Sequence, residues 1–301
     1  MSFSSDVKTE LCRLPLGSAS LAAVEVYGAL LFANCFTHQE IRVITAHADF
    51  AQRLPRLLQR AFGFGPDAAE RSGARGKHVL TIREPEKIAA IFARFGCSDL
   101  DCFLAHHVNF SVLEEEGAGA AFLRGAFLAG GSVTDPDKRC HLELVTDHRS
   151  VAGGAFVVLR ELGFAPKQTE RKGHAVIYFK QSDAIGDLCT TMGAPAAALR
   201  VMSAKIEKDM RNTVNRRVNC DNANADKIVS AAQAQLDRLR EIERDEGLDA
   251  LPDELRQIAL LRIANPEASL SDLAQLSDPP VSKSAVAHRM RRLMGWKSEE
   301  S

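Results

Sequence analysis

The same order of predicted elements occurs twice in the first two thirds of this chain. Each copy has the apolar spacing of a helix, then a strand, a helix, a strand and a helix. In the first copy these elements are residues 18–35, 40–46, 48–62, 77–84 and 84–95, and in the second they are 118–136, 139–147, 148–164, 174–181 and 182–194. A unit of this length present only twice predicts a domain with pseudo-two-fold symmetry and excludes a long solenoid.

After Pro195 the strand patterns stop and the remaining segments have helical spacing. A helical pattern continues through residues 199–220 and 222–247, and three shorter segments between Pro and Ser/Asp turns occupy 249–296. The fold class is therefore α+β for the doubled domain, followed by an all-α domain. The predicted bounds are 1–198 for the doubled domain (repeats about 1–110 and 111–198), 199–222 for a basic helical linker, and 223–301 for the C-terminal domain.

The C-terminal segment has the pattern of a helix-turn-helix. Ser269 followed by Asp272 is a capping box with Asp in place of Glu or Gln, so it predicts the start of a short helix. The turn DPPV follows, and Ser282 or Ser284 caps a second, basic helix. Two short helices joined by a tight turn, the second one basic, are typical of proteins that insert a helix into the major groove.

The predicted basic helix has two different faces. Its apolar residues recur at helical intervals and are expected in the core: Val286, Met290 and Leu293. The residues expected to contact base edges are Ser282, Lys283, Ser284, Ala287 and His288. The residues expected to contact phosphates are Arg289, Arg291, Arg292 and Lys297. The alternative is a solvated helix of a bundle, because cations at a helix C-terminus are favoured in any case.

Net charge measured over the whole chain conceals this basic helix. The chain has 38 Lys and Arg against 39 Asp and Glu, which alone gives no sign of nucleic-acid binding. Residues 283–297 nevertheless contain five Lys or Arg and no acid. A second basic run either contacts phosphates or is a solvated linker, and its candidates are Arg200, Lys205, Lys208, Arg211, Arg216 and Arg217.

Composition and cysteine usage predict a cytoplasmic protein without a membrane partner. The longest apolar stretches, 21–36 and 117–131, contain charged or polar residues and do not reach the ~20 apolar residues of a membrane span. The N-terminus does not resemble a signal peptide. Seven dispersed cysteines without a CxxC pair indicate free thiols. Cys97, Cys102, His106 and His107 lie close in sequence, but their spacing favours an ordinary loop over a zinc site, and we expect no cofactor.

Four segments resemble the WhiA family, over about residues 2–296: FSSDVKTEL, RGAFLAGGSVTDPDKRCHLELVT, KDMRNTVNRRVNCDNANADK and GLDALPDELRQIALLRIANPEASLSDLAQLSDPPVSKSAVAHRMRRL. The resemblance implies an N-terminal domain related to LAGLIDADG homing endonucleases, built from αββαββα repeats. It also implies a C-terminal helix-turn-helix domain similar to region 4 of sigma factors. Such proteins are bacterial DNA-binding regulators linked to sporulation in some lineages and to cell division and chromosome segregation in others.

The resemblance also locates the positions where a nuclease carries its metal-binding acids. Gly130 stands at this position in the second repeat and Ala33 in the first, and neither side chain can bind a cation. We therefore expect no nuclease activity and no metal site. Asp135 would restore one only after a large loop shift. Small residues such as Gly125 and Gly130 are instead expected to let two helices pack closely.

We expect a sequence-specific DNA-binding transcriptional regulator, associated with the nucleoid, that binds double-stranded DNA in promoter regions. RNA polymerase or another transcription regulator is a candidate protein partner. Two alternatives belong to other classes. One is a residual metal-dependent nuclease, and the other is a docking protein for the transcription or division machinery in which DNA binding is secondary.

Overall fold

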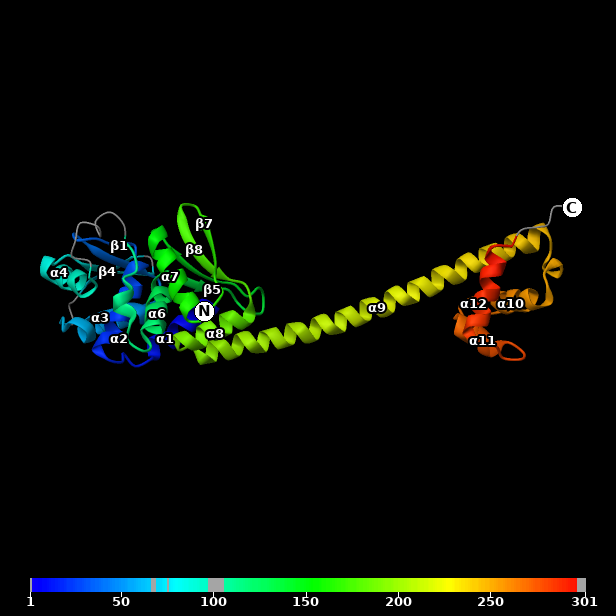
Figure 1. Ribbon diagram of the computed structural model, residues 1–301, viewed down its shortest axis with the longest axis horizontal. Helices are drawn as coiled ribbons and strands as arrows, with labels where there is room; N and C mark the ends of the chain where they lie inside the picture. Colours follow the sequence, from blue (N-terminus) through cyan, green and yellow to red (C-terminus); the bar gives the residue numbers. More distant parts are fainter. Residues whose placement is uncertain (1, 66–68, 75, 97–105, 297–301) are drawn as a thin grey trace. The chain divides into compact units, whose positions relative to one another are not determined.

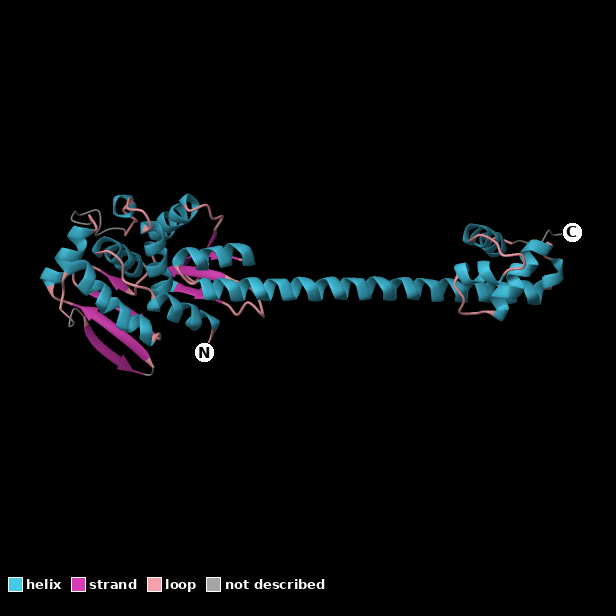
Figure 2. Ribbon diagram, turned by 90° about the horizontal axis from the view of Figure 1, so that it is seen from below, coloured by secondary structure: helices cyan, strands magenta, loops and turns pink. Residues whose placement is uncertain are grey.

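The structure is a computed structural model that describes residues 2–65, 69–74, 76–96 and 106–296. It divides into two compact units, Met1–Asp209 and Met210–Ser301. The first unit contains both sheets of the described chain, and the second is helical (Figures 1 and 2). No helix in the described part of the chain is long and apolar enough to cross a membrane.

The first unit contains the αββαββα order twice, as the family resemblance predicts. After α1 (Phe3–Arg13), the first repeat comprises α2 (Ala19–Leu31), β1 (Cys35–Phe36), β2 (Ile41–Thr45), α3 (Ala48–Phe62), β3 (Glu70–Ala74), β4 (Lys77–Ile82) and α4 (Pro85–Arg94). After η1 (Phe110–Leu113), the second comprises α6 (Ala118–Gly130), β5 (Gly131–Val133), β6 (Leu142–Thr146), α7 (Arg149–Glu161), β7 (Lys167–Arg171), β8 (His174–Phe179) and α8 (Ser182–Met192).

Each repeat forms its own antiparallel sheet, with strand orders β1-β2-β4-β3 and β5-β6-β8-β7. The registers correspond: Val43 faces Leu80 in the first sheet, and Leu144 faces Ile177 in the second. The residue patterns alone predicted only the two central strands of each sheet. The outer strands were missed because β1 and β5 have two and three residues, too few to show a period. The edge strand β7 is exposed at every position and has no apolar alternation.

The two repeats meet where α2 packs against α6, and this contact is close enough to exclude side chains. A Cβ atom on Gly28 would lie 2.1 Å from the carbonyl oxygen of Phe122. A Cβ atom on Gly125 would lie 1.9 Å from the carbonyl oxygen of Glu25. Because both glycines lack a Cβ, the two helix backbones come into direct contact. The close packing expected at Gly125 is therefore confirmed, and it has a counterpart at Gly28.

A buried ion pair lies beside this helix contact. Arg53 of α3 donates from Nε to Glu25 Oε1 (2.7 Å) and from Nη2 to Glu25 Oε2 (3.0 Å), and both side chains are almost fully buried. Arg124 of α6 donates from Nε to the same carboxylate at 2.9 Å. Arg53 also donates to the carbonyl of Leu14 at 2.6 Å. The pair thus connects α2, α3 and α6, and its donors and acceptors are satisfied within the core.

The second unit is built around the C-terminal part of α9 (Pro195–Asp245). This single helix covers the predicted segment 199–220 and most of the segment 222–247, which we expected to be separate. After α9 the chain forms η2 (Leu248–Ala250), α10 (Asp253–Ala264), α11 (Leu270–Leu276) and α12 (Lys283–Met294). The core of this unit comprises Leu239, Ile242, Leu251, Leu255, Ile258, Ala259, Leu273, Ala274, Val286, Met290 and Leu293. α12 therefore packs on α10 and α11 and turns its other side to solvent.

Candidate nucleic-acid interface

The helix-turn-helix consists of α11, the turn after it, and α12. Ser269 Oγ accepts from the backbone N–H of Asp272 (3.2 Å), and Asp272 Oδ2 accepts from that of Ser269 (2.9 Å), so the predicted capping box is present. Hydrogen bonds from the side chain and the backbone N–H of Ser269 to the carboxylate lower the pKa of the Asp272 carboxyl. Of the two serines considered as caps for α12, Ser282 has this role, because its Oγ accepts from the N–H of Ala285. Local capping therefore sets where both helices begin.

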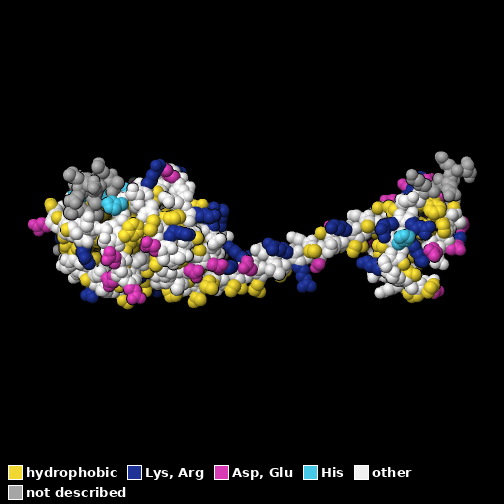
Figure 3. Space-filling model, in the orientation of Figure 1, with side chains coloured by type: hydrophobic (Ala, Val, Ile, Leu, Met, Phe, Trp, Pro, Cys, Tyr) yellow, Lys and Arg dark blue, Asp and Glu magenta, His cyan; other side chains and the backbone are white. Residues whose placement is uncertain are grey.

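The side of α12 opposite the core exposes most of the residues assigned to base contacts. Lys283, Ser284 and His288 are exposed, and Ala287 is half-buried. Ser282 is also exposed, but its Oγ serves the helix cap and lies 2.9 Å from Ser284 Oγ. In Figure 3, Lys and Arg side chains gather over α12 on this side of the second unit. The surface is polar and basic, and no acid occurs in α12.

The residues assigned to phosphate contacts differ in solvent exposure and in ion pairing. Arg291 and Arg292 are exposed in the last turn of α12. Arg289 is half-buried, and its Nε lies 3.8 Å from a carboxylate oxygen of Glu254 on α10. Lys297 lies outside the described residues. The exposed cations available to a phosphate in the described part of α12 are therefore Lys283, Arg291 and Arg292.

A buried arginine that the sequence analysis did not single out shapes the turn before α11. Arg262 of α10 is only 2% exposed. Its Nη1 donates to the carbonyl of Ala268 at 2.6 Å, and the carbonyls of Asn265 and Pro266 lie 3.4 Å away. Burial lowers the pKa of its guanidinium. This side chain fixes the α10–α11 connection, and through it the position of α11 under α12.

The basic run at the start of α9 divides into two groups. Lys205 donates to both carboxylate oxygens of Asp183 (2.6 and 2.7 Å), and Lys208 donates to the carbonyls of Pro136 and Lys138 (2.5 and 3.1 Å). Arg200 pairs with Asp6. Arg211, Arg216 and Arg217, in contrast, are exposed and have no ion pair within the described part of the chain. They are the members of the run that remain open to a ligand.

The family resemblance places the nuclease acids at Gly130 and Ala33, and at Gly130 the structure leaves little room for a side chain. A Cβ atom on Gly130 would lie 2.5 Å from the carbonyl oxygen of Val145 and 3.0 Å from the ring of Phe32. Ala33 lies two residues after the end of α2, is half-buried and packs against the core. Asp135 Oδ1 accepts from the N–H of Asp137, as in an Asx turn. Among the described residues, no three His, Cys, Asp or Glu side chains are grouped to hold a metal ion. Cys97 and Cys102 lie outside them.

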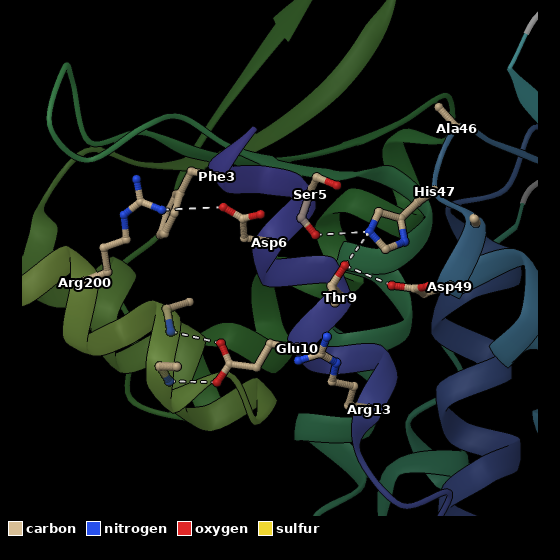
Figure 4. A pocket seen from close by; sticks show the side chains of 13 residues that line it. Phe3, Ser5, Asp6, Thr9, Glu10, Arg13, Ala46, His47, Asp49 and Arg200 are labelled. Atoms are coloured by element: carbon tan, nitrogen blue, oxygen red, sulfur yellow. Dashed lines mark hydrogen bonds and ion pairs between the residues drawn. The ribbon is translucent and has the colours of Figure 1, made fainter. Parts of the chain in front are cut away.

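A cavity of about 700 Å³ in the first unit lies between α1 and the beginnings of α3 and α9 (Figure 4). Most of its polar side chains bond to neighbouring groups of the cavity wall. Glu10 accepts from the backbone N–H groups of Ala196 (2.7 Å) and Ala197 (2.9 Å), and so caps α9. His47 Nε2 lies 3.1 Å from the carbonyl of Ser5. These bonds connect α1 with α3 and α9, so we interpret the cavity as part of the packing between helices. The candidate nucleic-acid interface remains α12.

A doubled αββαββα domain followed by a helix-turn-helix with an exposed basic helix defines a class of protein in which a domain resembling the LAGLIDADG fold is joined to a separate helix-turn-helix unit. Residues 33–100 and 119–211 match the WhiA LAGLIDADG-like domain, and residues 214–296 match the WhiA C-terminal HTH domain. The chain belongs to the WhiA family.

Relatives and a solved structure agree with this assignment over nearly the whole chain. Probable cell division protein WhiA of Ruminiclostridium cellulolyticum is 37% identical, over 97% of this chain and 96% of that protein. The protein of the same name from Staphylococcus haemolyticus is 35% identical, over 97% and 95%. Full-length DUF199/WhiA from Thermatoga maritima has the same fold, with a TM-score of 0.59 and 21% identity over 98% of this chain and 97% of that one. The names of the two relatives refer to cell division and to no enzymatic activity.

Proposed function

We propose that this protein is a sequence-specific DNA-binding transcription regulator that places α12 in the major groove. The observation that carries the proposal is the exposure of Lys283, Ser284 and His288 at the start and middle of a helix whose opposite side is buried. Short polar side chains, Lys and His at these positions suit the donor and acceptor pattern of base edges. In this proposal the C-terminal domain, for which the sequence predicts the bounds 223–301, recognises the DNA sequence.

Arg291 and Arg292 supply the contacts that position the helix. They lie in the last turn of α12, are exposed, and carry charge that a phosphate neutralises without regard to base sequence. Arg289 has a different role in this proposal. Because it is half-buried next to Glu254, it holds α12 against α10 and contributes little to phosphate binding.

The N-terminal domain has no nuclease activity in this proposal. A carboxylate at Gly130 would clash with the backbone of β6, and Ala33 has no group that binds a cation. The names of the relatives connect the family with cell division. We infer that the protein acts on the nucleoid, where it regulates genes for division, chromosome segregation or sporulation.

The proposal is tested by selecting DNA from a pool of duplexes with random sequence, using the full-length protein. A regulator that reads bases enriches a defined motif, and Lys283→Ala or Ser284→Ala relaxes the preference at one or two positions of it. If the wild-type protein enriches no motif while still binding duplexes, base readout by α12 is wrong.

The absence of nuclease activity has its own test. Supercoiled plasmid is incubated with the protein and Mg²⁺ or Mn²⁺, and the proposal predicts no nicked or linear product. Cleavage that disappears in Asp135→Asn would revive the enzymatic alternative, because Asp135 is the nearest acid downstream of Gly130 in the sequence.

A further inference from the structure

The middle of α9 has two faces of different chemistry, and the function proposed above uses neither. From Met210 to Val229 every residue is exposed, and all of them belong to the second unit. One face carries an apolar row that includes Val214 and Val218. Asn212, Asn215 and Asn219 follow one another along the face of the helix that lies roughly opposite Met210 and Val214, the two residues at the start of this row.

The asparagine row is flanked by cations and lacks acids. Arg211 lies one turn before Asn215, and Arg216 lies one turn after Asn212. No Asp or Glu occurs from Met210 to Cys220. The side chains of Asn212, Asn215 and Asn219 form no hydrogen bond in the part of the chain that the structure describes. Three amides and two guanidinium groups therefore point outward from one helix face without internal partners.

Helix stability does not explain this composition. Asn is less favourable than Ala in a helix by roughly 0.7 kcal/mol per residue, and residues 212–224 contain five of them. A solvated connecting helix would be better made from Ala, Glu, Lys or Gln. Asn and Arg do, however, share one chemical property, because each can form two parallel hydrogen bonds to a base edge, Asn to adenine and Arg to guanine.

We propose that this Asn/Arg face of α9, formed by Arg211, Asn212, Asn215, Arg216 and Asn219, is a second DNA-reading element. The proposal rests on the proposed function, namely that the chain binds duplex DNA. The asparagines contact adenines in the major groove, and the arginines contact guanine or phosphate. Neutral amides can donate to phosphate oxygens, but they add no charge, so a row of three asparagines favours base readout over general attraction to polyanions.

The two reading elements contact separate parts of the duplex. Within the second unit, Leu239 is the first residue of α9 in the core that supports α12. At 1.5 Å per residue, Asn219 lies about 30 Å from Leu239 along the helix. The selected DNA motif should therefore contain two blocks, one read by α12 and one read by the Asn/Arg face.

The test uses the full-length protein and the same pool of random-sequence duplexes. The first variant is Asn212→Ala/Asn215→Ala/Asn219→Ala, and the matched control is Met210→Ala/Val214→Ala on the roughly opposite face. Both sets introduce the best helix former, so neither should unfold α9. The triple variant is expected to lose one block of the motif, and to bind the wild-type motif about tenfold more weakly or worse. The control should keep both blocks and bind within about twofold of wild type.

The inference is overturned if the triple variant selects the wild-type motif with unchanged affinity. It is also overturned if the triple variant weakens binding to unrelated duplexes as much as binding to the motif, because that result indicates contacts without base readout. These results differ from failure of the proposed function. If Lys283→Ala relaxes one block while the triple variant changes nothing, only the second element is wrong, whereas a wild-type protein that selects no motif removes both.

Discussion

Gly28 of α2 and Gly125 of α6 have equivalent roles in the contact between the two repeats. Each glycine faces the backbone of the opposite helix, Gly28 near Phe122 and Gly125 near Glu25. The pseudo-two-fold symmetry of the domain is therefore visible at single-residue level. The contact depends on the absence of a side chain at two places.

We predict that Gly125→Ala and Gly28→Ala each destabilise the first unit, by about 3 kcal/mol or more, because the added methyl group overlaps backbone atoms that cannot move independently. Gly153→Ala in α7 is the matched control. Its Cβ would have no neighbour within 4 Å, so the same substitution should stabilise by roughly 0.5–1 kcal/mol. Urea unfolding followed by circular dichroism measures both, and equal effects at Gly125 and Gly153 would contradict the close contact.

The Glu25–Arg53 pair predicts strong coupling between α2 and α3. Arg53→Met leaves the buried carboxylate with Arg124 as its remaining partner, and the expected loss of unfolding free energy is about 3–5 kcal/mol. The double variant Arg53→Met/Glu25→Gln should cost less than the sum of the two single variants. Chemical denaturation of all four proteins gives the coupling energy, and strict additivity would show that the pair does not act as a unit.

Burial of Cys189 predicts a loss of stability at high pH. Burial raises the pKa of its thiol from 9.0 to about 12. Above pH 9 the unfolded chain releases this proton and the folded chain retains it, so stability from this group is complete below pH 9 and declines up to about pH 12, by at most about 1.4 kcal/mol per pH unit. Cys189→Ala removes the effect. Its stability difference from wild type should therefore shrink between pH 8.5 and 10.5, and a constant difference would contradict the prediction.

We predict that replacing the buried Arg262 destabilises the second unit. Arg262→Met removes the donor to the carbonyls of residues 265–268, and we expect about 1–3 kcal/mol of destabilisation. Trp296 is the single tryptophan of the chain and donates from Nε1 to Glu246, so its fluorescence reports this unit. In urea unfolding followed by this fluorescence, the midpoint of Arg262→Met should lie at a lower urea concentration than that of wild type. An unchanged midpoint would mean that Arg262 does not hold the turn.

Local rules explain which parts of this structure could be predicted from the sequence. The capping box at Ser269 and the buried positions Val286, Met290 and Leu293 follow from short-range patterns, and the structure confirms them. The outer strands were available only from the family resemblance, because strands such as β7 are stabilised by a neighbouring strand and show no pattern of their own.

Tertiary contacts account for what the sequence could not predict. The sequence assigns Arg289 and Arg291 alike to phosphate contacts. Packing of α12 on α10, however, brings Arg289 next to Glu254. Arg262 resembles an exposed cation in the last turn of a helix, and only the fold of the chain after α10 buries it. In the sequence, Lys205 and Lys208 resemble the exposed arginines that follow them. Only the fold brings Asp183 next to Lys205 and the carbonyl of Pro136 next to Lys208.

The most direct test of the central claim is the salt dependence of DNA binding by Arg291→Ala/Arg292→Ala. Affinity for a selected duplex is measured over a series of salt concentrations, for this variant and for wild type. Each phosphate contact contributes about 0.9 to the slope of log affinity against log salt. If both arginines contact phosphates, the variant binds all duplexes more weakly, and its slope is shallower by about two. A wild-type slope in the double variant would contradict the placement of α12 on the DNA.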